Sequence, residues 1–406
     1  MVDFLLTEEQ RALQGLAREF AQREIRPIAA ERDRMTDMVA RFPWDVLELA
    51  SHQGLRTLRV PRELGGAGVD TLTLCVVGEE IAAGDLGVAV TLDQTWKISH
   101  LLYHMATPAQ RERFLKDFVT DHRFHMAIAM TEPGSGSDRY AYFDAPDSQL
   151  KTVARRERGG WALNGVKQFI SNAGIAKLYV VYANTDPAKG LWHGSTMFLV
   201  PAGTPGFRTG RVHEKVGQRL AQNAELIFEN CWLSDEHVLG EAHRAFAARG
   251  AFTRGSHTEA GATALGVGRA AYEAALEWAN ARVQGGRRII EHQAVGTTLA
   301  EMALQIEAAR ALIWKAAWAA DHQDPFDPKL PGMAKVLASE VAHRVTVLAQ
   351  ELFGGMGIMA EASMEKLVRD ALTFLHSDGT NLIHRVRMGR LLDQKGTPPP
   401  VYTGVV

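Results

Sequence analysis

The 406-residue sequence is poor in cysteine and has no long hydrophobic run. Its two cysteines, Cys75 and Cys231, lie in apolar or strand-like contexts without Cys-x-x-Cys or Cys/His spacing. We therefore expect two buried thiols, with no disulfide framework and no metal site. No apolar stretch is long enough to cross a bilayer, and the start, MVDFLLTEEQ, lacks the basic region and apolar core of a signal peptide. These absences predict a cytoplasmic protein.

The sequence also lacks an excess of charge of either sign. It has 45 Lys and Arg residues against 47 Asp and Glu residues, which gives a formal net charge of −2. Nucleic acids and anionic membranes bind through basic surfaces, so we expect neither as a partner. The composition, 46% hydrophobic and 23% charged, is that of a globular protein with a sizeable core. The chain length favours two or three domains.

The hydrophobic pattern changes twice along the chain. Residues 1–122 have helical spacing; Thr7 marks a helix start, and helices are predicted from there to about Pro27 and over about 71–83, 88–104 and 108–119. Residues 123–239 hold short, often alternating segments separated by turn residues such as Asn164–Gly165, which predict a barrel or small sandwich of strands. Residues 240–406 are helical again, with long helices expected over about 253–283, 290–320 and 329–353. The sequence thus predicts three domains in an α–β–α order, an α+β fold.

Four short stretches hold residues suited to ligand binding. TEPGSGSD (131–138) has small residues that let backbone N–H groups approach an anion or a ring edge, and KQFISN (167–172) offers an aromatic ring for stacking. ARVQGGRRIIEHQ (281–293) has arginines suited to phosphate, and ELFGGMG (351–357) ends a helix with three glycines. Taken singly, each also fits an ordinary loop, a core aromatic, a charged turn or a helix cap.

A fifth stretch, FLHSDGTNLIHR (374–385), contains a carboxylate with two interpretations. Asp378 precedes Gly-Thr-Asn and a helical pattern that starts near Thr380. An aspartate in this position is commonly an N-cap or Asx-turn residue. It could also serve as a catalytic base, and the stretch alone does not distinguish the two roles.

Taken together and in this order, the five stretches resemble the flavin-dependent acyl-CoA dehydrogenase family over nearly the whole chain. The resemblance implies an N-terminal helical domain, a middle β-barrel and a C-terminal four-helix bundle, with FAD between the barrel and the bundle. It implies that Asp378 removes a Cα proton from an acyl-CoA, or carrier-bound, thioester while flavin N5 accepts a hydride from Cβ. Electrons would pass to an electron-transfer flavoprotein, and the shared active site implies a homo-oligomer, usually a tetramer.

The same resemblance assigns the binding residues. Flavin contacts would come from one chain through Met130, Thr131, Phe169, Ser171 and Thr380, and the rest of the FAD would meet a neighbouring chain through Arg282, Gln293, Glu351, Gly354 and Gly355. Ser137 would contact the CoA moiety. The acyl group would be bounded by Asp93, Gln94, Trp96 and Lys97 on one helix, and by His257 and Gly379.

Several positions depart from the family pattern. Asp378 stands where the family has Glu, so the carboxylate is one methylene shorter, and Ser377 replaces an aromatic residue, which widens the pocket. Both changes favour a branched or cyclic acyl group. Asp93 and Lys97 are expected to form an ion pair, the alternative being that they bind a polar acyl terminus. Val88 replaces the arginine of glutaryl-CoA relatives, which disfavours a dicarboxylic substrate.

Two rival functions remain open. Nitroalkane oxidases share this fold and use an Asp base supported by a Ser and an Arg, which match Asp378, Ser256 and Arg385; MVDF, GGRRIIEHQ and ALIWKA also look similar. Such an enzyme would use oxygen as its electron acceptor. The intact TEPGSGSD with Ser137 favours a CoA substrate instead. A DNA-binding flavoprotein without enzymatic activity is disfavoured by the net charge and by the retained carboxylate.

Overall fold

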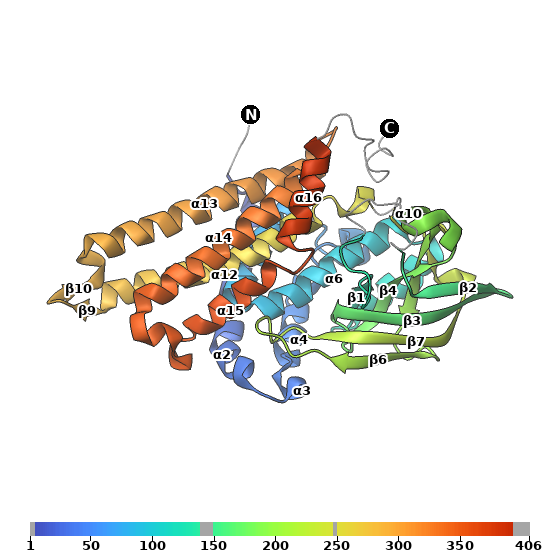
Figure 1. The fold of residues 1–406 in the computed structure, drawn as a ribbon, viewed down its shortest axis with the longest axis horizontal. Coiled ribbons are helices and arrows are strands. Elements are labelled where there is room, and N and C mark those ends of the chain that lie inside the picture. The colour runs from blue at the N-terminus through green and yellow to red at the C-terminus, as the bar shows by residue number, and fades with distance from the viewer. Residues whose placement is uncertain (1–4, 139–148, 247–249, 393–406) are drawn as a thin grey trace.

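The computed structural model describes residues 5–138, 149–246 and 250–392, so the MVDF stretch and residues 393–406 of the predicted C-terminal domain lie outside the described residues. A helical region, a sheet region and a second helical region follow one another along the chain. Figure 1 shows the C-terminal helices extending to one side, the sheet on the other, and the N-terminal helices across the middle. The predicted α+β class and the helix–sheet–helix order are confirmed.

The first helix begins as predicted and runs further than predicted. Thr7 Oγ1 accepts a hydrogen bond from Gln10 N at 3.2 Å, and Gln10 Oε1 accepts one from Thr7 N at 2.9 Å, so the two residues form a capping box. The predicted end near Pro27 is wrong. A π-helical turn joins two helices there, and Pro27 lies in the first turn of the second helix, where its missing N–H is not needed. The helices of this region are α1 (Glu8–Phe20), α2 (Arg26–Arg34), α3 (Met38–Arg41), α4 (Trp44–His52), α5 (Thr71–Gly84), α6 (Leu86–Met105), α7 (Pro108–Gln110) and α8 (Lys116–Thr120).

The middle region is one sheet with the path β6-β7-β3-β2-β4-β5-β8, to which β1 adds by pairing with β4. Asn164 and Gly165, expected in a turn, lie inside β3 at a register shift opposite β7. Gly165 has φ +147°, and a Cβ there would lie 2.6 Å from Thr152 Cα, so glycine is required by close approach. The strands are β1 (His125–Ala129), β2 (Val153–Glu157), β3 (Gly160–Ser171), β4 (Ala176–Asn184), β5 (Ser195–Pro201), β6 (Phe207–Val212), β7 (Asn223–Ser234) and β8 (Val238–Leu239), with the short α10 (Gly190–Gly194) before β5.

The C-terminal region is built around one helix with small residues at its contacts. A Cβ on Gly266 of α12 would lie 2.3 Å from Glu79 O in α5, and one on Gly268 would lie 2.9 Å from Ala342 Cα in α14. The helix α12 is therefore packed closely on both sides. The elements are α12 (Ser256–Ala281), the hairpin β9 (Val283–Gln284) and β10 (Arg287–Arg288), α13 (Gln293–His322), α14 (Leu330–Phe353), α15 (Met364–Phe374) and α16 (Asn381–Leu392).

A network of buried charges joins the two helical regions. Glu79 on α5 pairs with Arg269 of α12 at 2.9 Å and with Arg310 of α13 at 2.7 Å. Its neighbour Glu80 pairs with Arg269 and with Arg18 of α1, both at 2.7 Å. Because each carboxylate has two cationic partners, burial of the charges is compensated. This network fixes α5 relative to α1, α12 and α13.

Both cysteines are free and buried, as predicted. Among residues 5–138, 149–246 and 250–392, no helix is both long enough and apolar enough to cross a membrane. Within the same ranges, no group of His, Cys, Asp and Glu side chains could hold a metal ion.

The close packing of α12 on α5 leads to a prediction. Gly266→Ala should destabilise the protein by about 1–3 kcal/mol, because the new methyl group overlaps the carbonyl of Glu79. The matched control is Gly15→Ala on the exposed face of α1, where a Cβ meets no atom within 4 Å and a gain of about 0.5–1 kcal/mol is expected. Thermal unfolding of both variants checks this, and an equal shift of the two midpoints would contradict it.

Candidate active site

A cleft of about 770 Å³ opens between the sheet and the C-terminal helices. Its walls come from α6, the loop after β1, the end of β3, the segment between β6 and β7, and the loop between α15 and α16. Ten residues singled out from the sequence line it together: Gln94, Met130, Thr131, Ser137, Phe169, Ser171, Ser377, Asp378, Gly379 and Thr380. Stretches more than 200 residues apart in the sequence (Met130 and Thr380, for example) therefore form one site.

The loop after β1 is held by a buried ion pair. Lys167 Nζ lies 2.6 Å from Glu132 Oε1, and both side chains are almost completely inaccessible to solvent. The same ammonium donates to Met130 O at 3.1 Å, and the Glu132 carboxylate accepts from Thr152 N at 3.0 Å. A buried pair of charges is tolerated when its remaining hydrogen-bonding capacity is satisfied in this way. The backbone beside Thr131 is therefore a rigid wall of the cleft.

Phe169 projects into the cleft because the strand is interrupted there. The pairing of β3 with β7 shifts register between Lys167 and Ile170, and Phe169 has φ +60°. Bulges of this kind change the direction in which a side chain points. A left-handed backbone conformation is unfavourable for an aromatic residue, so it is kept only where the surrounding structure enforces it. The ring is 57% exposed and lies 4.9 Å from the ring of His213. The alternative that Phe169 is an ordinary core residue is wrong.

The chemistry of the cleft fits a flat heteroaromatic ring. Phe169 supplies a face for stacking, and the hydroxyl-bearing residues Thr131, Ser171 and Thr380 lie on the same lining. His213 Nε2, in the cleft wall, is buried and has no hydrogen-bond partner among the described residues. An unpaired buried nitrogen is unfavourable unless a ligand or water meets it. These features suit a flavin ring, which combines a stacking surface with hydrogen-bonding edges.

Asp378 lies in the loop between α15 and α16 and has φ +53°. It does not cap α16: Thr380 Oγ1 accepts a hydrogen bond from Ile383 N at 3.2 Å, so Thr380 is the N-cap. The interpretation of Asp378 as the capping residue is therefore wrong, although the predicted helix start near Thr380 is confirmed. The Asp378 side chain is 32% exposed and lines the cleft instead.

Buried side chains from two helices fix the backbone of this loop. Lys335 of α14 donates from Nζ to Phe374 O at 2.7 Å, to Gly379 O at 2.9 Å and to Asn381 Oδ1 at 2.8 Å. His384 of α16 contacts Asp378 O through Nε2 at 2.9 Å. Burial lowers the pKa of Lys335 to about 8 and that of His384 to about 4, so the imidazole is neutral near pH 7.

The predicted substrate-binding residues on α6 and α12 differ in their surroundings, and most of them do not line the cleft. Lys97 Nζ lies 2.6 Å from Asp93 Oδ2 and 3.2 Å from Asp378 Oδ2, so the expected ion pair is present and also includes the loop carboxylate. Trp96 is buried and donates from Nε1 to Leu55 O at 2.7 Å. The α6 residues that line the cleft are Val90 and Gln94. On α12, His257 is buried with its ring 4.7 Å from that of His384.

Three family models match the chain in sequence order: the N-terminal domain of acyl-CoA dehydrogenase over residues 7–122, the middle domain over 127–231 and the C-terminal domain over 250–392. The chain belongs to the acyl-CoA dehydrogenase family. Members are FAD-dependent oxidoreductases, so the predicted family, enzyme class and cofactor are confirmed.

Relatives of known activity match over nearly their full length. The short-chain specific acyl-CoA dehydrogenase of Megasphaera elsdenii is 34% identical over 395 residues, which cover 96% of this chain and 100% of that protein. The cyclohex-1-ene-1-carbonyl-CoA dehydrogenase of Syntrophus aciditrophicus is 36% identical over 390 residues, 95% and 90% of the two chains. The solved structure of butyryl-CoA dehydrogenase from M. elsdenii superposes with a TM-score of 0.88 at 33% identity, covering 96% and 100%.

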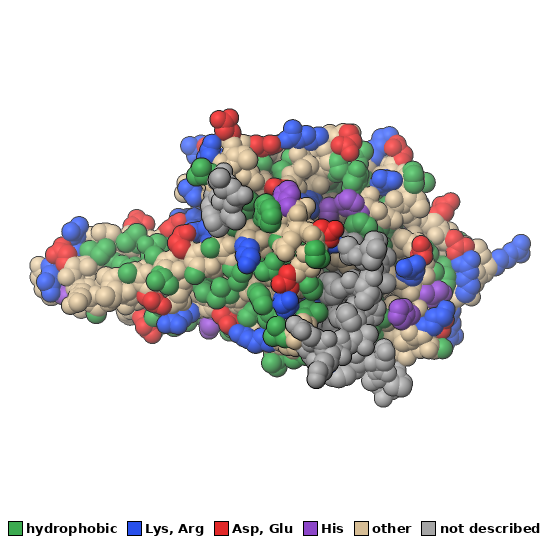
Figure 2. All heavy atoms as spheres, turned by 90° about the horizontal axis from the view of Figure 1, so that it is seen from above, with side chains coloured by type: hydrophobic (Ala, Val, Ile, Leu, Met, Phe, Trp, Pro, Cys, Tyr) green, Lys and Arg blue, Asp and Glu red, His purple; other side chains and the backbone are tan. Residues whose placement is uncertain are grey.

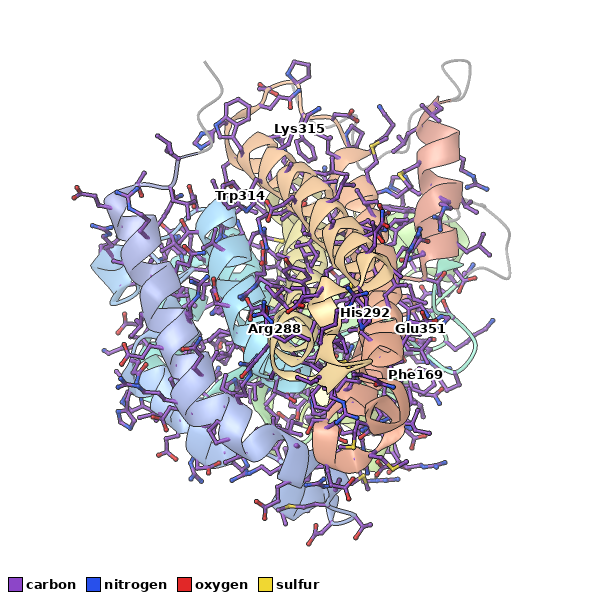
Figure 3. The ribbon with its side chains drawn as sticks, turned by 90° about the vertical axis from the view of Figure 1, so that its left-hand side faces the viewer. Phe169, Arg288, His292, Trp314, Lys315 and Glu351 are labelled. Atoms are coloured by element: carbon purple, nitrogen blue, oxygen red, sulfur yellow. The ribbon has the colours of Figure 1, made fainter. Side chains whose placement is uncertain are left out.

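A second group of predicted FAD residues of this chain lies at the far tip of the bundle. Arg282, Gln293, Glu351, Gly354 and Gly355 are exposed and do not line the cleft. Arg282 lies near the Gly354 turn, since its guanidinium is 5.8 Å from the centre of the Trp278 ring and that ring stacks on Phe353 at 4.9 Å. Figure 3 shows Arg288, His292 and Glu351 at this end of the molecule. One chain thus carries the two sets of predicted FAD residues in two separate places.

Ser256 and Arg385 make contacts other than the expected ones. Ser256 Oγ donates to Thr253 O at 3.0 Å, and Arg385 forms an ion pair with Glu340 at 2.7 Å in which both side chains are about half exposed. Neither residue lines the cleft. The trio of Asp378, Ser256 and Arg385 is therefore not gathered around the cleft.

The segment between β6 and β7 supplies cleft residues that the sequence interpretation missed. Gln218 Nε2 lies 2.5 Å from Thr373 Oγ1 and 3.3 Å from Ser377 Oγ. Lys215 donates to Asn223 Oδ1 at 2.6 Å, and burial lowers its pKa to about 7. The only signal in the sequence was the polar run HEKVGQRLAQN, which is too long for a simple turn between two strands.

The contacts of Lys335 predict that this residue maintains the Asp378 loop. Lys335→Met removes the ammonium that donates to Phe374 O, Gly379 O and Asn381 Oδ1, so the free energy of unfolding should fall by about 2–4 kcal/mol. Lys315→Met, on the exposed face of α13, is the control and should change it by less than about 0.5 kcal/mol. Denaturant unfolding of the two variants is the measurement; a Lys335 variant as stable as the control would contradict the role.

Proposed function

We propose that the chain dehydrogenates an acyl thioester of CoA, or of a carrier protein, between Cα and Cβ, with Asp378 as the proton-abstracting base. The observation that carries this proposal is the position of the Asp378 carboxylate in the cleft that also holds Phe169 and Ser171. A base must reach the reacting proton in the same space in which the redox cofactor meets the substrate. Asp378 is the lining carboxylate on the loop that Lys335 and His384 fix in place.

The residues of the cleft have separate roles in this reaction. Bound FAD supplies an acceptor for the hydride from Cβ. Phe169 packs against its ring, and Thr131, Ser171 and Thr380 offer hydroxyl groups to its polar edges. Asp378 takes the Cα proton onto a carboxylate oxygen. Ser137, at another part of the same lining, contacts the CoA moiety.

We propose a short branched or cyclic acyl group as the substrate. The Asp378 and Ser377 side chains are smaller than the glutamate and the aromatic residue of the family pattern, which supports a substrate bulky near Cα and Cβ, although the Gln218 amide, 3.3 Å from Ser377 Oγ, takes part of this space. On α6, Gln94 lines the cleft with Val90 and limits its apolar depth, which disfavours a long straight chain. The cyclohex-1-ene-1-carbonyl-CoA dehydrogenase among the relatives acts on a cyclic acyl group. Electrons would then pass to an electron-transfer flavoprotein.

We also propose that the FAD site is completed between two subunits of a homo-oligomer, a tetramer by family resemblance. The exposed group at the bundle tip, Arg282 with Gln293 and the Gly354 turn, supports this because it is separate from the cleft of its own chain. Figure 2 shows hydrophobic side chains along the bundle surface. On α13, Leu304 is 64% exposed and Trp318 54%. Large exposed apolar residues of this kind commonly mark protein contacts.

The nitroalkane alternative has less support. It requires Ser256 and Arg385 near the base, whereas Ser256 bonds to Thr253 and Arg385 pairs with Glu340. It is retained as an outcome of the test below.

Anaerobic titration of the holoenzyme tests the reaction. Branched and cyclic acyl-CoA thioesters should bleach the flavin absorbance faster than straight-chain ones of equal carbon number, since Ser377 and Asp378 leave lateral space. Asp378→Asn should keep its FAD but lower the reduction rate at least about 100-fold, because the amide cannot accept the proton.

Asp327→Asn, in the linker before α14, is the matched control and should reduce normally. If a broad acyl-CoA panel leaves the flavin oxidised while nitroethane bleaches it, the dehydrogenase proposal fails. Normal reduction by Asp378→Asn would show that another group is the base.

The shared cofactor site makes a separate prediction. Arg282→Ala should lose FAD on gel filtration and show a weaker FAD affinity, by about tenfold or more, because a charge-assisted contact to phosphate is removed. Arg158→Ala, an exposed arginine in the turn between β2 and β3, serves as the control. Absorbance of bound flavin per chain measures the effect, and equal FAD contents in the two variants would refute the shared site.

A further inference from the structure

A buried cluster of charges adjoins Asp378. Asp93 and Lys97 lie one turn apart on α6, and Lys97 Nζ bridges the two aspartates, at 2.6 Å from Asp93 Oδ2 and 3.2 Å from Asp378 Oδ2. The Lys97 side chain is 12% exposed and that of Asp93 2%. Because the bridge joins residues 281 positions apart in the sequence, it ties α6 directly to the loop of the base.

The cluster contains more carboxyl groups than ammonium groups. Glu259 of α12 is buried close enough to Lys97 and Asp378 to interact electrostatically with both. Asp93 Oδ1 and Glu259 Oε2 are buried and have no hydrogen-bond partner among the described residues. A fully ionised carboxylate with an unpaired buried oxygen is unfavourable, so the cluster favours a protonated carboxyl at one of these two positions.

Burial raises the pKa of Asp93 to about 7 and also raises that of Glu259. Burial alone would lower the pKa of Lys97, but the carboxylates of Asp378 and Asp93 outweigh it and raise that pKa. Lys97 is therefore an ammonium throughout the ordinary pH range.

The remaining charged or titratable groups around this point come from several elements. Lys335 on α14 and His384 on α16 contact the loop backbone, and His257 of α12 packs on His384. Further out, Arg59 and Asp321 lie 3.6 Å apart and largely offset each other. Of the cations in this set, Lys97 is the one that forms an ion pair with the Asp378 carboxylate.

We propose that Lys97 is a positioning residue for Asp378, which fixes the short carboxylate beside the cleft and keeps it ionised, while Asp93 stays ionised as the second counter-ion of Lys97 and the spare proton of the cluster resides on Glu259. The inference rests on the proposed role of Asp378 as the base. A cation at this distance favours the charged carboxylate, the form that can accept a proton.

Asp93 has a complementary purpose in this arrangement. When Asp378 accepts the Cα proton, it becomes neutral and Lys97 loses one of its two counter-ions. A buried ammonium without a counter-ion would be strongly unfavourable. Asp93, held 2.6 Å away, remains as the partner of Lys97, so proton transfer does not leave the ammonium unpaired.

Carbon-13 NMR of the holoenzyme with labelled aspartate carboxyl groups tests the proposal without a substrate. The resonance of Asp378 is identified by its loss in Asp378→Asn. Lys97→Met should raise the titration midpoint of Asp378 by at least about one pH unit, Lys97→Arg should return the midpoint most of the way to the wild-type value, and Asp93→Asn, which keeps the cation, should not raise it.

Reduction kinetics provide the second measurement. A cation that stabilises the carboxylate lowers the pKa of the base, so its removal raises that pKa, and the acid limb of the rate–pH profile should move to higher pH by the same amount. Well below the new limb, a midpoint raised by about one pH unit lowers the reduction rate of Lys97→Met about tenfold. At higher pH the rate should recover, and KM should change less than the rate, because Lys97 acts through Asp378 and not on the acyl group.

The double variant Lys97→Met/Asp93→Asn guards against a folding defect, since it leaves no unpaired carboxylate on α6; it should show the same raised midpoint. An unchanged midpoint in both Lys97→Met and the double variant would overturn the proposal, as would a change confined to KM, which would assign Lys97 to the acyl terminus. If the midpoint rises but no acyl-CoA reduces the wild-type flavin, the proposed function fails and the pairing of Lys97 with Asp378 stands.

Discussion

The ammonium of Lys335 is the constraint on which the loop of Asp378 depends. Residues 375–380 belong to no helix or strand, so their geometry must be fixed by other contacts. Lys335, completely buried in α14, donates to oxygens on both sides of Asp378. A charged donor compensated by three acceptors makes this contact strong, and its removal would take a donor from each of the three oxygens, of which Asn381 Oδ1 keeps a second donor, Ser339 Oγ. The position of Asp378 is thus set by the bundle and not by the loop itself.

The opposite wall of the cleft is also held by a buried lysine. Lys167, buried in β3, pairs with Glu132 and donates to Met130 O, which holds the loop after β1. Two walls of the cleft are therefore short irregular segments, each fixed by one buried lysine. Such segments can present both side chains and backbone groups to a ligand, because their backbone groups are not used in a helix or sheet. They remain rigid because each is hydrogen-bonded to its buried lysine. A preformed cleft of this kind requires little rearrangement when a ligand binds.

The sequence predicted the regular parts of the fold well and the special conformations poorly. Helices α5 and α6 were expected within two residues of their observed ends because their apolar patterns are uninterrupted. The π turn before Pro27 and the strand interior at Gly165 were missed, because each depends on tertiary contacts that local propensity does not report. Within the site, the motifs located Phe169 and Asp378, but the bridge from Lys97 to Asp378 and the contacts of Gln218 join distant segments and could be found only in three dimensions.

The contact between Gln218 and Ser377 limits which amino-acid substitutions the cleft can accept. Gln218, held in a left-handed conformation with φ +51°, touches both Thr373 and Ser377 from the sheet side of the cleft. An aromatic side chain at position 377 would occupy the space into which the Gln218 amide points and would remove one of its two acceptors. Positions 218 and 377 are therefore expected to be epistatic: a large residue at one is tolerated only after a change at the other, so the shape of the cleft at this point is encoded by a pair of residues from two domains.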